Sequence, residues 1–230
     1  MKLEKLLLPG PCMEDAPDRF ARARRRMVKR QLAARGIGDR RVLDAMGRVP
    51  RELFLPQGAR TRAYCDGAQS IGCGQTISQP YIVALMTQAL HLTGDERVLE
   101  VGTGSGYQAA VLAELVHHVY TVERMPELSH RAEQILRDGL GYANISFRVG
   151  DGTLGWPEHG PFDRFVVTAA APALPEALVE QLAPEGEGVA PVGGRRHQVL
   201  THYRKSPDGE VESEELCGCV FVRLVGKDAW

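Results

Sequence analysis

From residue 97 onward, strand-like and helix-like runs alternate along the chain, and this alternation constrains the fold more than any other feature. Short apolar runs predict strands at 97–101, 118–122, 145–149, 163–168, 189–192, 197–204 and 216–225. Helix-like runs lie at 106–116, 126–139 and 175–182. Such alternation predicts an α/β fold with a doubly wound, mostly parallel seven-stranded sheet, covered by helices on both faces. The turn signal Pro207-Asp208-Gly209 joins the last two strands directly and predicts an antiparallel edge.

The part of the chain before this sheet is predicted to be helical. Between Arg19 and Arg30 seven residues are Lys or Arg, and apolar residues interleave with them at helical spacing. Gly36 and Gly38 end this helix, and a second helix is expected over 39–48. A basic helix can bind nucleic acid or a membrane surface, but a solvated helix that caps the domain agrees better with the near-neutral total charge.

The length of 230 residues suits one domain with a small appendage. Residues 1–18 contain three prolines and little periodicity, so we expect a loose extension there. The remainder, 19–230, is expected to be one domain. Within it, 19–80 forms a helical segment that covers the substrate and cofactor, and 81–230 forms a Rossmann-like core.

Charge and cysteine content limit the classes of function. The net charge of −1 gives no electrostatic footprint for nucleic acid or an anionic membrane, and no apolar run is long enough to span a bilayer. Five irregularly spaced cysteines do not form a disulfide framework, which favours the cytoplasm. The histidines lack neighbours at metal-ligand spacing, so we expect no metal site. We also expect a monomer.

A glycine-rich turn between a buried strand and a helix is the first candidate binding feature. Gly102, Gly104 and Gly106 alternate along it, so the backbone can approach a ligand closely. The third glycine of a dinucleotide fingerprint would stand at Tyr107, and a Walker phosphate loop is excluded because no Gly-Lys-Ser/Thr follows. By itself the turn is weak evidence, since tight turns use glycine for structural reasons alone.

Acidic residues at successive strand ends indicate which kind of ligand the glycine turn could bind. Glu123 ends the next strand, where its carboxylate can accept both hydroxyls of a ribose; paired with Arg124, it can equally be a surface residue. Asp151 and Gly152 end the third strand, where they could contact an adenine edge or form an ordinary turn. Glu100 could hold an ammonium group. Acids with a glycine turn match S-adenosylmethionine, which lacks phosphate, better than they match a dinucleotide.

The sequence also resembles the protein-L-isoaspartate O-methyltransferase family. The specific part is the run Gly74-Gln75-Thr76-Ile77-Ser78-Gln79-Pro80. The resemblance continues through Leu99–Tyr107, Gly150-Asp151-Gly152, Thr168–Pro172 and Pro191-Val192-Gly193. Together with Val49-Pro50-Arg51-Glu52 in the N-terminal part, it covers roughly residues 20–226. Ala68, Cys73 and Arg223 depart from the family pattern near the expected peptide edge, which leaves peptide preference open.

The resemblance implies methyl transfer from S-adenosylmethionine to the free α-carboxylate of L-isoaspartyl residues in damaged proteins, which initiates their repair. It implies cofactor contacts from Gln75, Thr76, Ile77, Ser78, Glu100, Gly102, Thr103, Gly104, Gly106, Glu123, Arg124, Asp151 and Gly152. Substrate contacts are expected from Asp66, Ile71, Thr76 and Val220. A carboxylate is already an anionic nucleophile at neutral pH, so alignment and hydrogen-bond donors are needed more than a base.

Ser78 is the candidate catalytic donor, supported by Thr76. From the residues alone, the favoured role of Ser78 is the N-cap of the helix that follows Gln79-Pro80, and the two roles can coexist. Three other functions stay open at this stage: a methyltransferase acting on a small molecule or RNA, an NAD-dependent oxidoreductase, and a catalytically silent binding protein. The second is disfavoured by Tyr107, and the third by the presence of Ser78, Glu123 and Asp151.

Overall fold

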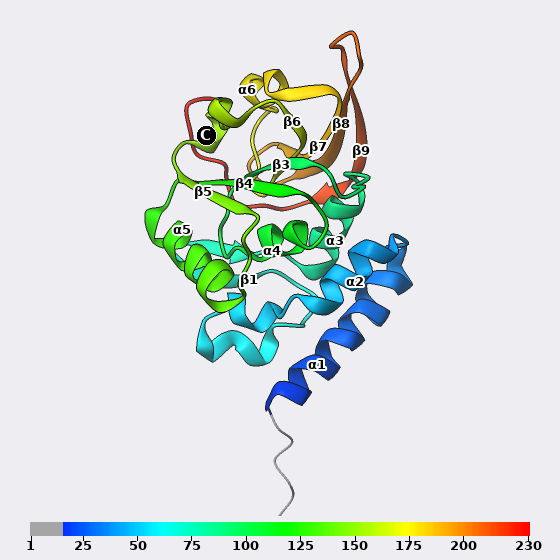
Figure 1. Ribbon diagram of the computed structural model, residues 1–230, viewed down its shortest axis with the longest axis vertical. Helices are drawn as coiled ribbons and strands as arrows, with labels where there is room; N and C mark the ends of the chain where they lie inside the picture. The colour runs from blue at the N-terminus through cyan, green and yellow to red at the C-terminus, as the bar shows by residue number, and fades with distance from the viewer. Residues whose placement is uncertain (1–15) are drawn as a thin grey trace, which may run out of the picture.

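The computed structural model describes residues 16–230, and its centre is a twisted seven-stranded sheet (Figure 1). The strands stand in the order β5-β4-β3-β6-β7-β8-β9. Their bounds are Arg97–Val101 for β3, His118–Glu123 for β4, Ile145–Val149 for β5, Phe162–Val167 for β6, Leu182–Gly193 for β7, Gln198–Lys205 for β8 and Val211–Cys219 for β9. The pairs from β5 to β7 are parallel, and β8 is antiparallel to both neighbours. The predicted fold class and its antiparallel edge are confirmed.

Alternate side chains of the central strands enter two different cores, as expected for a sheet that is covered on both faces. In β3, Val98 belongs to the core shared with α3 (Pro80–Gln88) and α4 (Tyr107–Ala113). Its neighbour Leu99 belongs to a second core that includes Leu178 of α6 (Glu176–Glu180). Because both faces are buried, apolar side chains occupy adjacent positions of β3, at Val98 and Leu99.

The N-terminal helices lie together beside α3 on one side of the sheet (Figure 1). Helix α1 (Ala16–Met27) continues through a wider π-type turn, Val28–Leu32, and α2 (Arg40–Arg48) is capped by the side chain of Asp39. Both predicted helices are confirmed. Because α1 begins at Ala16, the last three residues of the predicted loose extension are helical, and its first fifteen lie outside the described residues. Among the described helices, none combines the length and apolarity needed to cross a bilayer.

A small hairpin, β1 (Gln69–Gly72) and β2 (Gln75–Ile77), precedes α3 and was not predicted. Its turn places Cys73 at a φ of 52°, between two glycines that also have positive φ. The run Gly72-Cys73-Gly74 is a turn signal between two short strand-like segments. The hairpin fixes the position of Ser78, because β2 ends at the residue before it.

The edge strand and several element ends differ from prediction. The last strand is Val211–Cys219 rather than 216–225. Its first half contains three glutamates and lies at the sheet edge with most side chains exposed, so it lacks the apolar alternation that marks a half-buried strand. Helix α5 (Pro126–Glu133) extends through Gln134–Gly139, which confirms the helix predicted over 126–139.

Candidate functional site

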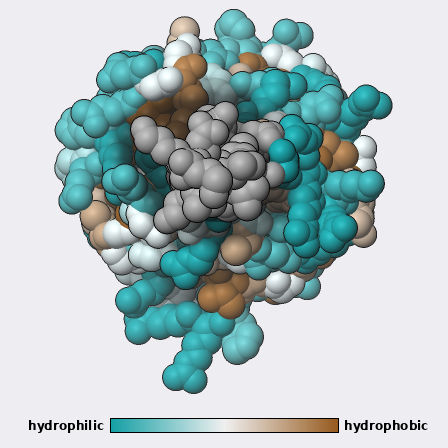
Figure 2. Space-filling model, turned by 90° about the horizontal axis from the view of Figure 1, so that it is seen from below, coloured by the Kyte–Doolittle hydropathy of each residue, from teal (hydrophilic) through white to brown (hydrophobic). Residues whose placement is uncertain are grey.

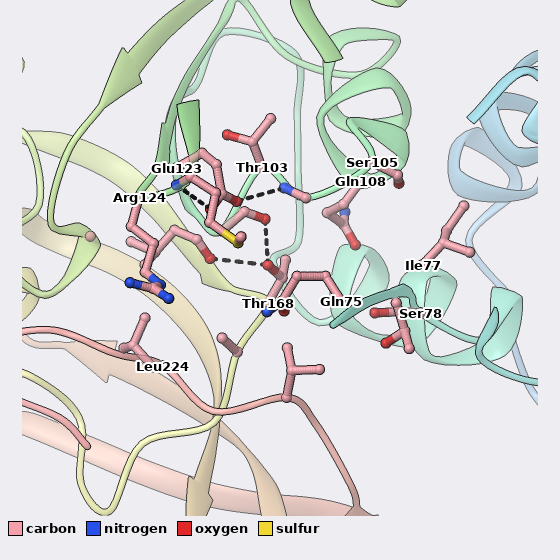
Figure 3. A pocket seen from close by; sticks show the side chains of 18 of the residues that line it. Gln75, Ile77, Ser78, Thr103, Ser105, Gln108, Glu123, Arg124, Thr168 and Leu224 are labelled. Atoms are coloured by element: carbon pink, nitrogen blue, oxygen red, sulfur yellow. Dashed lines mark hydrogen bonds between the residues drawn. The ribbon is translucent and has the colours of Figure 1, made fainter. Parts of the chain in front are cut away.

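A cavity opens at the carboxyl ends of β3, β4 and β6, the edge of a parallel sheet where ligands usually bind (Figure 3). Three parts of the chain surround it: the glycine turn, the ends of β4 and β6, and a cover from β2 and the C-terminal segment. Its lining includes Gln75, Thr76, Ile77, Ser78, Gly102, Thr103, Gly104, Glu123, Arg124 and Gly152, ten of the predicted residues.

The glycine turn is fixed from below by Thr168 at the end of β6. The Thr168 hydroxyl donates to the carbonyl oxygen of Gly102 at 2.6 Å. Gly102 has a φ of 96°, and a Cβ atom built there would stand 2.4 Å from the Thr168 Oγ1 atom. A side chain at this position would therefore strain the backbone and displace Thr168. The turn is held rigid while its backbone stays open to the cavity.

Glu123 is held by the turn that it faces. One carboxylate oxygen accepts from the backbone N–H of Gly104 at 3.0 Å, and the other accepts from the N–H of Met125 at 3.0 Å. The side chain is almost fully buried but still lines the cavity. Because a carboxylate oxygen has two lone pairs, each can accept a further hydrogen bond from a ligand. The alternative interpretation of Glu123 as a surface residue paired with Arg124 does not agree with this placement.

The opposite side of the cavity is formed by the segment that follows β2. Figure 3 shows Ile77 and Ser78 on one side of the space and Glu123 and Arg124 on the other. The carbonyl oxygen of Ser78 accepts from the guanidinium of Arg51 at 2.7 Å. Arg51 is completely buried, donates also to Ala63, and lies over the ring of Tyr107. Burial lowers the pKa of Arg51 from its ordinary value. A buried cation thus fixes the backbone at Ser78.

The helix-cap interpretation of Ser78 is not supported. Helix α3 begins at Pro80, its N-cap position is Gln79, and that residue makes no capping hydrogen bond through its side chain. Ser78 therefore stands one residue outside the cap. Its hydroxyl has no hydrogen-bond partner among residues 16–230, although the residue lines the cavity. This leaves the hydroxyl available to a ligand.

Three predicted cofactor residues do not line the cavity. Glu100 is fully buried beneath the glycine turn, where the Thr121 hydroxyl donates to it at 2.5 Å. Burial raises the pKa of Glu100 to about 8, and the nearby charge of Glu123 adds to this rise. Gly106 packs against Ala132 and Leu136 of the α5 region. The third, Asp151, holds the C-terminal segment.

Asp151 connects the third strand end to the last residues of the chain. One carboxylate oxygen accepts from the N–H and the hydroxyl of Thr153, and the other accepts from the N–H of Lys227 at 2.8 Å. Burial by itself would raise the pKa of Asp151. The hydrogen bonds lower the pKa by more than burial raises it, so the pKa lies below its ordinary value. The segment held in this way supplies the cavity walls Val222, Arg223, Leu224 and Val225. Asp151 therefore supports one wall of the cavity.

The predicted substrate residues are spread around the cover. Thr76 lines the cavity and is exposed. Asp66 binds Arg35 at 3.0 Å and accepts from the Gln79 amide at 2.7 Å, so it holds the segment that contains Ser78. Ile71 is fully buried in β1, and Val220 is 76% exposed just after β9. Of these predicted substrate residues, the structure brings only Thr76 into the cavity lining.

Several lining residues were not predicted from the sequence. Thr168 directly follows β6, so the rule that ligands bind at the carboxyl ends of parallel strands could have identified it. Gln108 lines the cavity from α4 and donates to the Thr87 hydroxyl at 2.9 Å. Arg51 does not line the cavity, but it binds the backbone of Ser78, which does.

A buried arginine beside a proline has no recognisable sequence signature. Only the family resemblance, through Val49-Pro50-Arg51-Glu52, drew attention to it.

Comparison with known proteins gives a consistent result. A family model described as protein-L-isoaspartate(D-aspartate) O-methyltransferase matches residues 22–229. The protein-L-isoaspartate O-methyltransferase 2 of Geotalea uraniireducens is 53% identical over 208 residues, which is 90% of this chain and 95% of that protein. The protein-L-isoaspartate O-methyltransferase 1 of Syntrophobacter fumaroxidans is 54% identical over 92% of this chain and 98% of its own length.

Solved structures agree with this likeness. A protein-L-isoaspartate O-methyltransferase superposes with a TM-score of 0.80 at 28% identity, covering 90% of this chain and 67% of that one. A beta-aspartate methyltransferase from Plasmodium falciparum, solved in complex with S-adenosyl-L-homocysteine, superposes with a TM-score of 0.76 at 26% identity. That comparison covers 88% of this chain and 98% of the other. The similarity therefore includes the N-terminal cover as well as the sheet.

Proposed function

The chain belongs to the protein-L-isoaspartate(D-aspartate) O-methyltransferase family, and on this premise we propose that the cavity between the glycine turn and Ser78 is its active site. The reaction is transfer of a methyl group from S-adenosylmethionine to the free α-carboxylate of an L-isoaspartyl residue in a damaged protein. The observation that carries the assignment of the site is Glu123. It is an almost buried carboxylate, fixed by two backbone N–H groups, and it faces a cavity whose lining contains no lysine among residues 16–230.

The residues of the cavity suit the cofactor. S-adenosylmethionine carries hydroxyls, an ammonium, a carboxylate and an adenine, and it supplies an electrophilic methyl group when bound. Glu123 would accept from the ribose hydroxyls, because its oxygens retain free lone pairs. The turn Gly102–Ser105 would offer backbone close to the ligand, and Met125 and Gly152 would add wall contacts. Glu100, Gly106 and Asp151 would act indirectly, by supporting the turn and the C-terminal wall.

Ser78 would orient the reacting carboxylate. The substrate carboxylate has a pKa of about 4 and is anionic at neutral pH, so no base is needed to create the nucleophile. Its solvation must be replaced inside the cavity, and a hydroxyl donor does this without the full positive charge that would weaken the nucleophile. The Ser78 hydroxyl is available for this role, and Arg51 fixes its backbone. Thr76, exposed at the mouth, would be the second donor.

We further propose a monomer that works in the cytoplasm on isoaspartyl proteins and peptides and binds neither nucleic acid nor membrane. The net charge of −1 supports this. In the basic helix α1, Arg24 is engaged within the chain, by the carbonyl oxygen of Arg48 and by Glu52 at 3.8 Å. In this view residues 19–230 work as one domain, with the helices and the hairpin covering the core.

The decisive experiment compares methyl transfer to an isoaspartyl peptide with transfer to the same peptide that contains a normal aspartyl residue. We expect transfer to the isoaspartyl peptide alone, and isothermal calorimetry should show far tighter binding of S-adenosyl-homocysteine than of NAD. Equal transfer to both peptides would contradict the substrate. A methylated RNA or small molecule, with neither peptide methylated, would favour a different methyltransferase of the same fold.

A further inference from the structure

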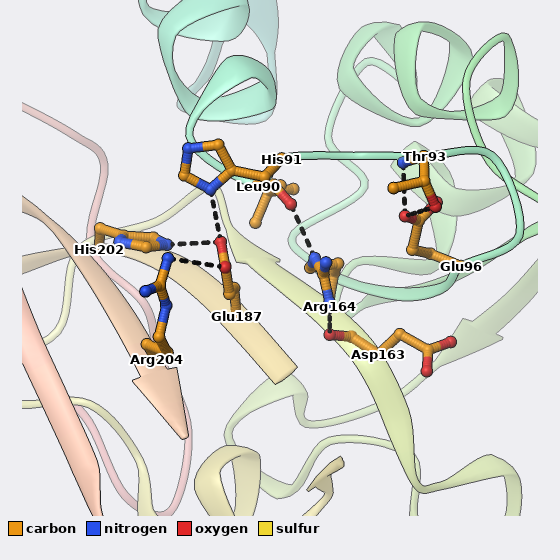
Figure 4. A network of polar contacts seen from close by, with 9 residues as sticks. All are labelled: Leu90, His91, Thr93, Glu96, Asp163, Arg164, Glu187, His202 and Arg204. Atoms are coloured by element: carbon orange, nitrogen blue, oxygen red, sulfur yellow. Dashed lines mark hydrogen bonds and ion pairs between the residues drawn. The ribbon is translucent and has the colours of Figure 1, made fainter. Parts of the chain in front are cut away.

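Two histidines and a glutamate meet at the end of the sheet that is remote from the cavity (Figure 4). Glu187 lies in β7 opposite Arg164, which is near the amino end of β6. The cavity lies at the carboxyl end of β6. His202 comes from β8, and His91 comes from the loop between α3 and β3. This cluster therefore belongs to a different part of the molecule from the methyl-transfer site.

One carboxylate oxygen of Glu187 is shared by both imidazoles. Its Oε2 atom lies 2.7 Å from the Nδ1 atom of His91 and 3.0 Å from the Nε2 atom of His202. All three donor atoms lie within 4.8 Å of one another. Glu187 and His202 are buried, whereas the His91 side chain is 62% exposed. The cluster is thus closed on the sheet side and open toward solvent above His91.

The sheet register fixes two members of the cluster. Glu187 pairs with Arg204 across the β7–β8 ladder, and His202 stands two residues before Arg204 on the same face. The Arg204 guanidinium donates to the second oxygen of Glu187 at 3.1 Å. The carboxylate is therefore anchored through its Oε1 atom and points its Oε2 atom between the two rings.

The loop that carries His91 is held rigid on both sides. Arg164 donates to the carbonyl oxygen of Leu90 at 2.7 Å, and Glu96 accepts from the N–H groups of Thr93 and Gly94. His91 itself has a φ of 46°, in the left-handed region where glycine is free of strain. The fold keeps a histidine in this position and aims its Nδ1 atom at Glu187 (Figure 4).

We propose that His91, Glu187 and His202 form a binding site for a divalent transition-metal ion, with Zn²⁺ as the best match to the donor set. Two imidazoles and one carboxylate are ligands that Zn²⁺ prefers, and three protein ligands leave a further position for water. Around Zn²⁺, ligand atoms at about 2.1 Å from the ion lie about 3.4 Å apart in tetrahedral geometry. The two distances from Glu187 Oε2 to the imidazole nitrogens, 2.7 and 3.0 Å, would each have to lengthen by less than about 1 Å to reach this arrangement.

The sequence could not reveal this site, and the expectation that the chain has no metal site rested on spacing alone. His91 and Glu187 are 96 residues apart, and Glu187 meets His202 only through the register of β7 and β8. Without an ion, the same three groups would form a hydrogen-bonded pin between the loop and the sheet. The two possibilities differ in a measurable way, because only a metal site takes up Zn²⁺ with defined stoichiometry.

Calorimetric titration with Zn²⁺ tests the proposal, with protein that has been treated with a chelator and kept in buffer without a thiol reductant. We expect one ion per chain, and we expect His91→Gly and His202→Ala each to weaken binding by more than about tenfold, the lower end of the cost of losing even an outer-shell partner. His91→Gly relieves the left-handed strain, so its melting temperature without metal should stay close to that of the wild type. His130→Ala, which removes an exposed histidine of α5, is the matched control and should bind as the wild type does.

Titration with Co²⁺ separates this site from the cysteines. Coordination by nitrogen and oxygen gives weak visible absorption without the strong near-ultraviolet thiolate band that cysteine ligation produces. Zn²⁺ should also raise the melting temperature of the wild type by more than that of His91→Gly, because the ion stabilises the folded state in proportion to its affinity for the folded site. No uptake by the wild type, equal uptake by His91→Gly, or a thiolate spectrum would each overturn the proposal.

Discussion

The two walls of the cavity are built differently. The floor, which consists of Gly102–Ser105, Glu123 and Thr168, has its polar groups tied to one another by hydrogen bonds. The cover, which consists of Gln75–Ser78 and Val222–Val225, has a fixed backbone at Ser78 but leaves the Ser78 hydroxyl without a partner among the described residues. A preorganised floor suits a ligand that must be held still. An unpaired donor on a fixed backbone suits a group whose charge distribution changes during reaction.

The variant Ser78→Ala is the strongest test of this difference between the floor and the cover. If the cover serves the reaction and the floor serves binding, turnover should fall while cofactor affinity stays nearly unchanged, because the lost donor acts mainly at the transition state. Loss of one preorganised donor costs at most about 2.7–4 kcal/mol, or about a hundredfold to a thousandfold in rate. Steady-state kinetics with an isoaspartyl peptide gives the rate, and calorimetry with S-adenosyl-homocysteine gives the affinity.

Thr76→Ala is the companion variant on the same cover, and its effect on turnover should be smaller. Melting temperatures of both variants should lie close to the wild-type value, since neither hydroxyl caps α3. A Ser78→Ala enzyme with full turnover would move the donor role to Thr76 or to the backbone.

The floor is tested by Glu123→Ala. Removal of a charged acceptor should weaken S-adenosyl-homocysteine binding by about 1.5–3 kcal/mol, which is roughly tenfold to 150-fold in Kd. The carboxylate also anchors Gly104 and Met125, so Glu123→Gln, which keeps one acceptor oxygen, should lose less affinity. Glu176→Ala removes an exposed glutamate of α6 and should bind normally. Unchanged affinity in Glu123→Ala would remove Glu123 from the cofactor site.

The smallest expected effect concerns the layer beneath the floor. The pKa of Glu100 is raised to about 8, so the folded protein keeps a proton there that the unfolded chain has released above a pKa of about 4.5. Stability without cofactor should therefore fall as pH rises from about 4.5 to 8. Glu100→Gln stays neutral and should lose this contribution to the pH dependence, so its melting temperature relative to the wild type should rise between pH 7 and pH 9.

The relative rise should correspond to on the order of 1 kcal/mol, or roughly 2–4 °C for a domain of this size. Glu180→Gln, at the exposed end of α6, controls for a general loss of charge. Parallel pH profiles for the wild type and Glu100→Gln would show that Glu100 is ionised in the folded protein.

The floor could be predicted from the sequence because its signals are local. The glycine turn follows a buried strand directly, and Glu123 ends the next strand, so a rule about strand ends was enough to place both in one site. Asp151 shows the limit of that rule. Asp151 does follow the end of β5, as predicted. Its carboxylate, however, accepts hydrogen bonds from Thr153 and from the N–H of Lys227, 76 residues later in the chain, and does not line the cavity.

The cover could be predicted mainly through the family resemblance. The hairpin before Ser78 is too short to give a clear sequence pattern, and the residues around Ser78 also fit a helix N-cap. The walls Val222–Val225 were expected as part of a strand, but β9 ends at Cys219. Beyond that point the chain bonds to Ala170 through Val222 and Leu224. These contacts join residues about 50 positions apart, and local periodicity carries no information about such pairs.

The charge of β9 has a consequence for an enzyme whose substrates are damaged chains. An open sheet edge is a template on which an extended, partly unfolded polypeptide can add a strand. Glu212, Glu214 and Glu215 place negative charge along this edge, with Glu210 just before it. Addition of a strand there would bury or crowd these carboxylates. Charged side chains on a sheet edge oppose such pairing, so we expect these glutamates to disfavour co-aggregation of the enzyme with unfolded chains.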